Sequence, residues 1–251
     1  AEIAAEQNKL VFYTNGPEDK HLANLRDRTK AVLYTTGESA SAISALFPKA
    51  RVVSVGNPLF EDWGKEDMVP REIVRKLYRL EPREQLILLA LEKFTLLNGS
   101  MYGSTLEALC LLKSRGATFR LVAGFHPGDE LKEHPELQQK VYLTLFKQNG
   151  LDVEFAPSKR ISLDLRQSVP GADLVIGSLT TVVRQAGAFG VPAMSVRGHE
   201  YDRMLTAMYG EPVWPPHDNL GFIYHKVHNT NPADILADGM AILLAPSGSD
   251  E

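Results

Sequence analysis

Polar residues suited to binding an anion follow five apolar segments in the second half of the sequence. An imidazole stands in Phe125-His126-Pro127-Gly128, and hydroxyls stand in Ser178-Leu179-Thr180-Thr181. Glycine, hydroxyl or cationic residues follow the other three segments, at 98–104, 157–160 and 197–200. Glycine lets a backbone approach a phosphate closely, and hydroxyl, imidazole and guanidinium groups donate hydrogen bonds to its oxygens. These residue types predict a local site for a phosphate or a nucleotide.

The sequence pattern predicts that these residues lie on an α/β fold with a Rossmann-like, doubly wound parallel sheet. Short runs rich in Val, Ile and Leu alternate with longer amphipathic stretches, and several runs are apolar throughout, which is typical of strands covered on both faces. The predicted strands are 10–14, 31–35, 51–55, 85–90, 118–124, 152–156, 173–177 and 193–196, and the predicted helices are 38–46, 71–80, 104–115, 129–148, 180–189 and 201–209.

The carboxyl ends of parallel strands share one edge of a sheet, where ligands bind in such folds. We therefore expect His126 to donate a hydrogen bond to a phosphate or leaving-group oxygen and to act catalytically, with Pro127 fixing the chain direction. The helix after Ser178 would offer unpaired N–H groups to the anion. Taken singly, Ser178 or Thr180 also reads as a simple N-cap. The residues predicted to bind phosphate from this pattern are Gly99, Ser100, His126, Pro127, Ser178, Thr180 and Thr181.

Helix boundary signals flank one of these loops. Ser104-Thr105-Leu106-Glu107 matches a capping box, which predicts that a helix begins there, and Gly116 stands where a C-terminal glycine would end it. Gly190 is predicted to end the helix after Ser178 in the same way.

Several other chemistries are disfavoured. The sequence has no G-x-x-x-x-G-K-[ST] loop, no G-x-G-x-x-G after a strand and no G-x-S-x-G elbow. His225 and His228 are spaced to contact a metal, but no cysteine joins them, so we expect no metal site. The one cysteine, Cys110, lies in an apolar run and is predicted to pack in the core.

Composition limits the class of partner. The formal net charge is −4 and the pI is about 6.0, so no global field attracts nucleic acid. No apolar run is long enough to span a membrane, and the first residues lack the pattern of a signal peptide. With a single cysteine, the sequence predicts a cytoplasmic protein without disulfides. Three segments are predicted: a partial N-terminal α/β segment at 1–57, a linker at 58–84 and a nucleotide-binding domain at 85–251.

Two motifs resemble the donor half of GT-B-fold glycosyltransferases. They are Phe125-His126-Pro127-Gly128 and the run from Ala172 to Pro192, and they are most similar to the branch of CDP-glycerol glycerophosphotransferases and bacterial polysialyltransferases. The segment Val53–Pro58 looks like the hinge of these enzymes. The resemblance implies a nucleotide-sugar or CDP-alcohol donor (CMP-, CDP- or UDP-linked), an acceptor glycan or lipid, and metal-independent transfer without a cofactor. It places His126, Ser178, Thr180 and Thr181 on the nucleotide phosphates, 156–161 near the base, and Arg197 or Glu200 on ribose or sugar.

The sequence departs from this family in two ways. An acidic residue of the family is replaced by Gln185, which would leave an amide to meet the ligand's hydroxyls. Only about three strands represent the acceptor half, so the resemblance implies a missing N-terminal domain or a partner subunit. Two alternatives stay open: a UDP-sugar 2-epimerase-like enzyme, and a non-catalytic module that binds a nucleotide or a protein.

Overall fold

The computed structural model describes residues 11–13, 31–34, 48–49, 51–54, 69–91, 102–129, 131–158, 162–178, 180–197, 224–228 and 233–245. The chain divides into two compact units, the first formed by 1–67 with 206–216 and the second by 68–205 with 217–251. The predicted helices 38–46 and 201–209 lie outside the described residues. Among the described residues, no helix combines the length and the apolar character needed to cross a membrane.

The first unit contains a three-stranded parallel sheet. Its strands are β1 (Val11–Tyr13), β2 (Ala31–Tyr34) and β3 (Arg51–Ser54), paired in that order. Each lies inside a predicted strand, so the prediction from the apolar runs is confirmed for these three segments.

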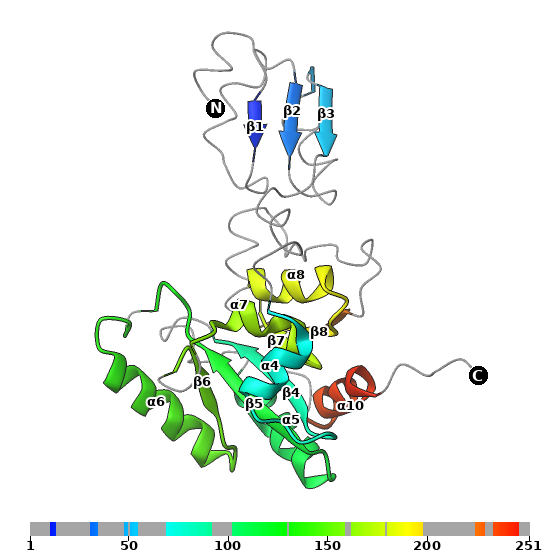
Figure 1. The fold of residues 1–251 in the computed structure, drawn as a ribbon. Coiled ribbons are helices and arrows are strands. Elements are labelled where there is room, and N and C mark those ends of the chain that lie inside the picture. The colour runs from blue at the N-terminus through cyan, green and yellow to red at the C-terminus, as the bar shows by residue number, and fades with distance from the viewer. Residues whose placement is uncertain are drawn as a thin grey trace, which may run out of the picture. The chain divides into compact units, whose positions relative to one another are not determined.

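The second unit is built on a six-stranded parallel sheet (Figure 1). In chain order the strands are β4 (Gln85–Ala90), β5 (Phe119–Gly124), β6 (Glu154–Ala156), β7 (Leu174–Gly177), β8 (Ala193–Arg197) and β9 (Tyr224–His228). Their order across the sheet is β6-β5-β4-β7-β8-β9, which is the 3-2-1-4-5-6 arrangement of the Rossmann fold. The predicted fold class is therefore confirmed.

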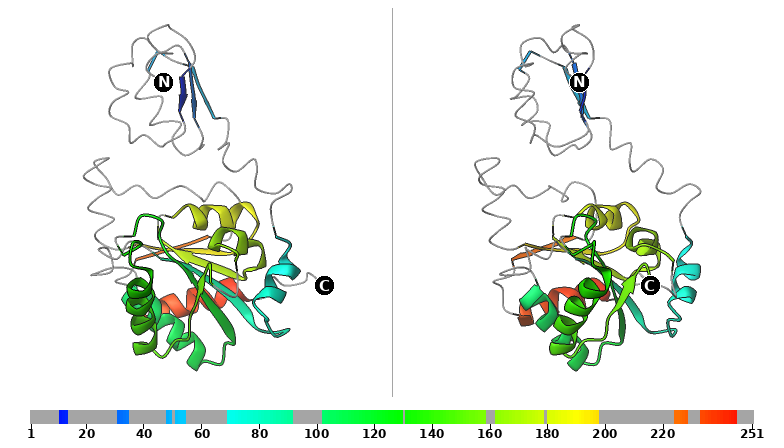
Figure 2. Two further views of the ribbon diagram at one scale, coloured as in Figure 1. Left: turned by 60° about the vertical axis from the view of Figure 1, so that its left-hand side comes forward. Right: turned by 90° about the vertical axis from the view of Figure 1, so that its left-hand side faces the viewer.

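Helices cover both faces of this sheet (Figure 2). One face is covered by α5 (Tyr102–Ser114), α6 (Pro135–Gln148) and α10 (Ala233–Leu244). The other is covered by α4 (Arg71–Leu77), α7 (Leu165–Ser168), the 3-10 turn η4 (Val169–Gly171) and α8 (Thr181–Ala188).

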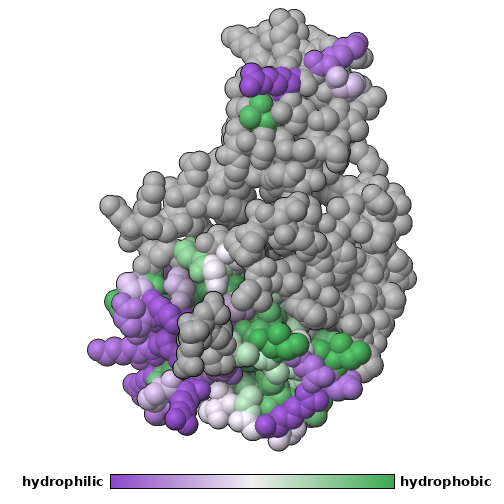
Figure 3. All heavy atoms as spheres, turned by 90° about the vertical axis from the view of Figure 1, so that its right-hand side faces the viewer, coloured by the Kyte–Doolittle hydropathy of each residue, from purple (hydrophilic) through white to green (hydrophobic). Residues whose placement is uncertain are grey.

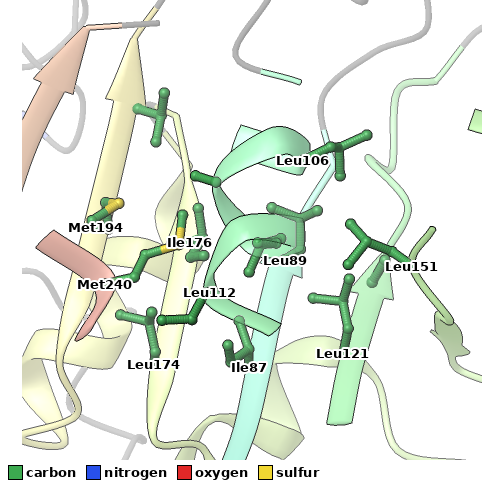
Figure 4. Close-up of a cluster of buried hydrophobic side chains, with 14 of the residues drawn as sticks. Ile87, Leu89, Leu106, Leu112, Leu121, Leu151, Leu174, Ile176, Met194 and Met240 are labelled. Carbon is green, nitrogen blue, oxygen red and sulfur yellow. The ribbon is translucent and has the colours of Figure 1, made fainter. Parts of the chain in front are cut away.

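The central strand β4 shows why the sheet needs both layers. Leu86 and Leu88 belong to the cluster under α4, α7 and α8, whereas Ile87 and Leu89 belong to the cluster under α5 and α10. All four side chains are fully buried, as the period of two in a strand requires when both faces are covered. Figure 4 shows the second cluster, in which Ile87 and Leu89 of β4 lie among Leu106 and Leu112 of α5 and Met240 of α10.

The structure corrects two predictions about α5. Cys110 is exposed, not packed in the core, because α5 directs Leu106, Leu109 and Leu112 to the sheet and leaves Cys110 on the outer side. The helix also begins at Tyr102, so Ser104 is its third residue and does not form the predicted cap. Gly116 does lie just beyond the helix with a φ of 95°, as predicted.

One helix boundary differs from the prediction, and some elements were not predicted. The helix predicted from Asp129 begins only at Pro135, because residues 126–129 form a tight turn and proline favours the first helical position. Strand β9 and helices α7 and α10 were not predicted. Helix α10 leaves Ile235 and Ile242 exposed, and Figure 3, seen from the α10 side, shows hydrophobic side chains there among hydrophilic ones.

Candidate functional site

The strand order places a topological switch point between β4 and β7. These two strands pair directly, and the chain leaves β4 for α5 on one face but leaves β7 for α8 on the other face. The starts of α5 and α8 therefore flank the carboxyl ends of two adjacent strands. In open α/β sheets this position forms the crevice in which ligands bind.

Each of these two crossovers contributes a buried hydroxyl that has no hydrogen-bond partner among the described residues. Thr105 in the first turn of α5 is fully buried, and Ser178 directly after β7 is 1% exposed. Within the described part of the chain, neither Thr105 Oγ1 nor Ser178 Oγ has a partner. Most buried polar atoms in proteins are paired, so these two hydroxyls, one on each side of the switch point, are candidates for contact with a ligand.

The first turns of α5 and α8 also lack carboxylates. Among the described helices of this unit, α4, α6 and α10 carry Glu72, Glu136 and Asp234 in their first turns, and α7 is capped by Asp164. Neither α5 nor α8 has an acidic residue there. No carboxylate of the first turn therefore offsets the partial positive charge of these two helix starts, a charge distribution that favours an anion.

The turn after β7 is tightly packed. Thr180 is the N-cap of α8, and its hydroxyl accepts a long hydrogen bond of 3.4 Å from the N–H of Val183. A side chain on Gly177 would place Cβ 2.9 Å from Val183 Cγ2 and 3.1 Å from Thr180 Oγ1, so glycine is required for this approach. Ser195 of β8 is fully buried and donates a hydrogen bond of 3.0 Å to the Ser178 carbonyl.

The turn after β5 presents His126. The N–H of Asp129 donates to the His126 carbonyl at 2.9 Å, which closes a turn with Pro127 at its second position. The Gly128 N–H donates to His126 Nδ1 at 2.9 Å. Since Nδ1 accepts this bond, the neutral imidazole carries its proton on Nε2, which is then a hydrogen-bond donor.

The structure describes some of the other predicted site residues. Thr181 is the first residue of α8, and Arg197 is the last residue of β8, which pairs with β7. Gln185 is 3% exposed, and its Oε1 has no partner among the described residues. Gly99, Ser100 and Glu200 lie outside the described residues. Ser178, Thr180, Thr181 and Gln185 thus share one strand–turn–helix unit, and His126 lies two strands away.

Three residues that the sequence did not single out belong to this region: Thr105, Gly177 and Ser195. The run Leu174–Gly177 directly before Ser178 marks Gly177 as a strand-end glycine, which is a signal that the sequence does contain. Thr105 and Ser195 carry no such signal, because a hydroxyl inside a helix or strand is revealed as buried only by the packing around it.

Two titratable groups with shifted pKa values lie away from this edge. Burial raises the pKa of Tyr78, and its hydrogen bond with Ser168 partly opposes that shift. Burial also favours a higher pKa for Asp173, but the Leu86 N–H, Arg71 and Arg75 outweigh it and lower the pKa below its ordinary value. Asp173 precedes β7, at the amino edge of the sheet, so we assign it to stability. Among the described residues, no group of three or more His, Cys, Asp or Glu side chains is arranged to hold a metal.

No protein-family model matches the sequence, and no curated protein matches it significantly. Solved structures do share its fold. A glycosyltransferase from Rickettsia africae is 11% identical with a TM-score of 0.55, over 94% of this chain and 60% of that one. The UDP-GlcNAc 2-epimerase from Methanocaldococcus jannaschii is 12% identical with a TM-score of 0.59, over 98% of this chain and 66% of that one.

The wall teichoic acid polymerase TagF is also similar, at 13% identity and a TM-score of 0.47 over 89% of this chain and 51% of that one. At these identities the likeness shows a common GT-B-type, Rossmann-like fold. The chain spans about half to two thirds of the length of these three structures.

Proposed function

We propose that this chain binds the phosphate or diphosphate of a nucleotide-activated donor between the starts of α5 and α8, as the donor half of a GT-B-type glycosyl or glycerophosphate transferase. The observation that carries the proposal is the pair of buried hydroxyls of Thr105 and Ser178, which lie one on each side of the topological switch point and have no partner in the described part of the chain. Their two helices also have no acidic residue in the first turn.

Charge would be stabilised on the departing nucleotide. In such a transfer the bond between the sugar or glycerophosphate group and the donor's phosphate oxygen breaks, and negative charge grows on the nucleotide phosphate. The N–H groups at the start of α8 and the Thr105 and Ser178 hydroxyls are the donors that would stabilise this charge.

His126 would act on the same leaving group from the neighbouring side. Its strand, β5, is separated from β7 by β4 alone, so the two strand ends lie about 10 Å apart. A nucleoside diphosphate can bridge that separation. The Nε2 proton, directed by the Gly128–Nδ1 hydrogen bond, would then be donated to a phosphate oxygen.

The donor and acceptor groups are proposed at the level of their chemistry. The His126-Pro127 and Ser178–Thr181 motifs favour a CMP-, CDP- or UDP-linked donor, with Gln185 and Arg197 near the ribose or sugar. Neutral donors and helix termini supply the proposed charge stabilisation, so we expect transfer to persist in a chelator. The base that activates the acceptor would come from the acceptor half or from a partner subunit.

A thermal-shift screen with CMP, CDP, UDP and GDP tests the proposal. A nucleotide present at about 100 times its dissociation constant should add about 2.7 kcal/mol to the free energy of unfolding. His126→Ala should reduce that gain, because it removes a contact to a charged group worth about 1.5–3 kcal/mol. A protein whose melting temperature no nucleotide changes would contradict the proposed site.

A further inference from the structure

The turn that carries His126 is held by a buried pair of polar side chains, Asp129 and Tyr142. Asp129 Oδ1 accepts the Leu131 N–H at 2.7 Å, and Oδ2 accepts the Tyr142 hydroxyl at 2.7 Å. Asp129 is 1% exposed and Tyr142 is fully buried. Since the Asp129 N–H also closes the turn on the His126 carbonyl, the carboxylate anchors the whole turn to α6.

The residue on the other side of His126 is anchored to the same place. The Phe125 ring stacks on the Phe155 ring of β6, with their centroids 4.8 Å apart. It also packs against the Tyr142 ring in an edge-to-face arrangement, with a centroid distance of 5.4 Å. Tyr142 therefore contacts the residue before His126 through its ring and supports the end of the turn through its hydroxyl. The backbone of His126 is fixed from both directions.

This anchoring sets the direction of the imidazole. The ring is held by the Gly128 N–H at Nδ1, and Gly128 belongs to the turn that Asp129 closes. A change in the turn would therefore rotate the ring and move Nε2. Displacements of about 1 Å are enough to reduce a contact of this kind strongly.

A buried carboxylate, that of Asp129, is an energetically costly group with which to hold a turn. Asp129 is buried, and no ion pair in the described part of the chain includes it. Its carboxylate is held by neutral donors, the Tyr142 hydroxyl and the Leu131 N–H. Burying a carboxylate without a cationic partner is unfavourable, so a role beyond closing a surface turn is indicated.

We propose that Asp129 and Tyr142 are positioning residues, which hold His126 Nε2 in the direction of the bound phosphate. The inference rests on the proposed function of His126 as a phosphate-binding group. Neither residue touches the ligand, and both act through the turn 126–129.

The chain offers a matched pair of variants. Tyr142→Phe removes the hydroxyl that Asp129 accepts and keeps the ring beside Phe125. Tyr78→Phe is the control, because Tyr78 is also fully buried and hydrogen-bonded, at 2.9 Å to Ser168, on the opposite face of the sheet. With CDP and UDP as probes, Tyr142→Phe should weaken binding about threefold to tenfold, and Tyr78→Phe should leave it unchanged.

A double-mutant cycle separates positioning from general stability. If Tyr142 acts through His126, Tyr142→Phe should have no further effect on nucleotide binding in a His126→Ala background. Additive effects, or equal losses in both tyrosine variants, would overturn the inference. If His126→Ala binds both nucleotides like wild type, the proposed function of His126 fails instead.

A second readout needs no nucleotide. Long-range ¹H–¹⁵N NMR spectra report which imidazole nitrogen carries the proton. We expect Nε2 protonation of neutral His126 in wild type and in Tyr78→Phe, and a changed ratio of tautomers or shifted ring signals in Tyr142→Phe. Unchanged His126 signals in Tyr142→Phe would overturn the positioning role.

Discussion

The Ser195 hydroxyl on β8 donates to the main-chain carbonyl of Ser178 at 3.0 Å, in the interior of the second unit. This bond joins the strand end that carries Ser178 to the neighbouring strand. It fixes the backbone from which both the Ser178 side chain and the start of α8 project. The geometry of the proposed anion site therefore depends on a residue that does not belong to the turn itself.

Ser195→Ala should weaken nucleotide binding and lower stability together. The substitution leaves the buried Ser178 carbonyl without this donor, at a cost of about 1–3 kcal/mol in the free energy of unfolding. Urea denaturation and calorimetric titration with CDP measure the two effects. Ser114→Ala is the control, because the Ser114 hydroxyl bonds the Leu111 carbonyl at an exposed position. A Ser195→Ala protein with wild-type affinity would show that Ser178 is held by other contacts.

Ser178→Ala and Thr105→Val should each weaken nucleotide binding without lowering the stability of the free protein. Each removes a buried hydroxyl that has no partner among the described residues, so the free protein should be equally stable or more stable. Binding of CDP should weaken about threefold to tenfold per hydroxyl, because each donor would be lost to the ligand. If either variant is clearly destabilised without nucleotide, its hydroxyl has a structural partner.

The pH dependence of the free energy of unfolding should show how much the charged Asp173 side chain stabilises the fold. Its pKa in the folded protein lies below the ordinary value of 3.8, so the fold favours the charged form. The resulting stabilisation is complete above that ordinary value and declines as the pH falls through the lower folded pKa. Asp173→Asn should therefore lower the free energy of unfolding by about 1–3 kcal/mol near neutral pH.

The control for this prediction is internal. The difference between wild type and Asp173→Asn should shrink in urea titrations as the pH is lowered below about 4. A difference that stays constant over that range would mean that the ion pairs with Arg71 and Arg75 do not stabilise the fold.

The elements of the sheet could be predicted where burial dictates composition. The strand β4 is covered on both faces, so Gln85–Ala90 is apolar after its first residue and its bounds follow from the sequence. The strand β9, Tyr224–His228, is largely polar and carries two histidines, so its sequence suggested a possible metal contact and not a strand. Its pairing with β8 is a long-range contact that local pattern does not contain.

The candidate site was predicted only in part. His126 and Ser178 were proposed as site residues because they follow apolar runs, which is a local signal. The role of Thr105 depends on burial inside a helix, and the role of Asp129 depends on Tyr142, thirteen positions later on another element. Cys110 shows the converse: an apolar neighbourhood in the sequence suggested burial, and helix geometry exposed it.

The most direct measurement is a ¹H–¹⁵N NMR titration of the protein with CDP and with UDP. An anion between the two helix starts should shift the amide signals of Gly103, Thr181 and Val182 most strongly, because these residues stand in the first turns of α5 and α8, whose N–H groups would face it. The acidic first turns of α6 and α10, at Glu136 and Asp234, serve as internal controls and should not respond. Saturable shifts confined to the starts of α5 and α8 would support the account. Shifts centred elsewhere, or none with either nucleotide, would contradict it.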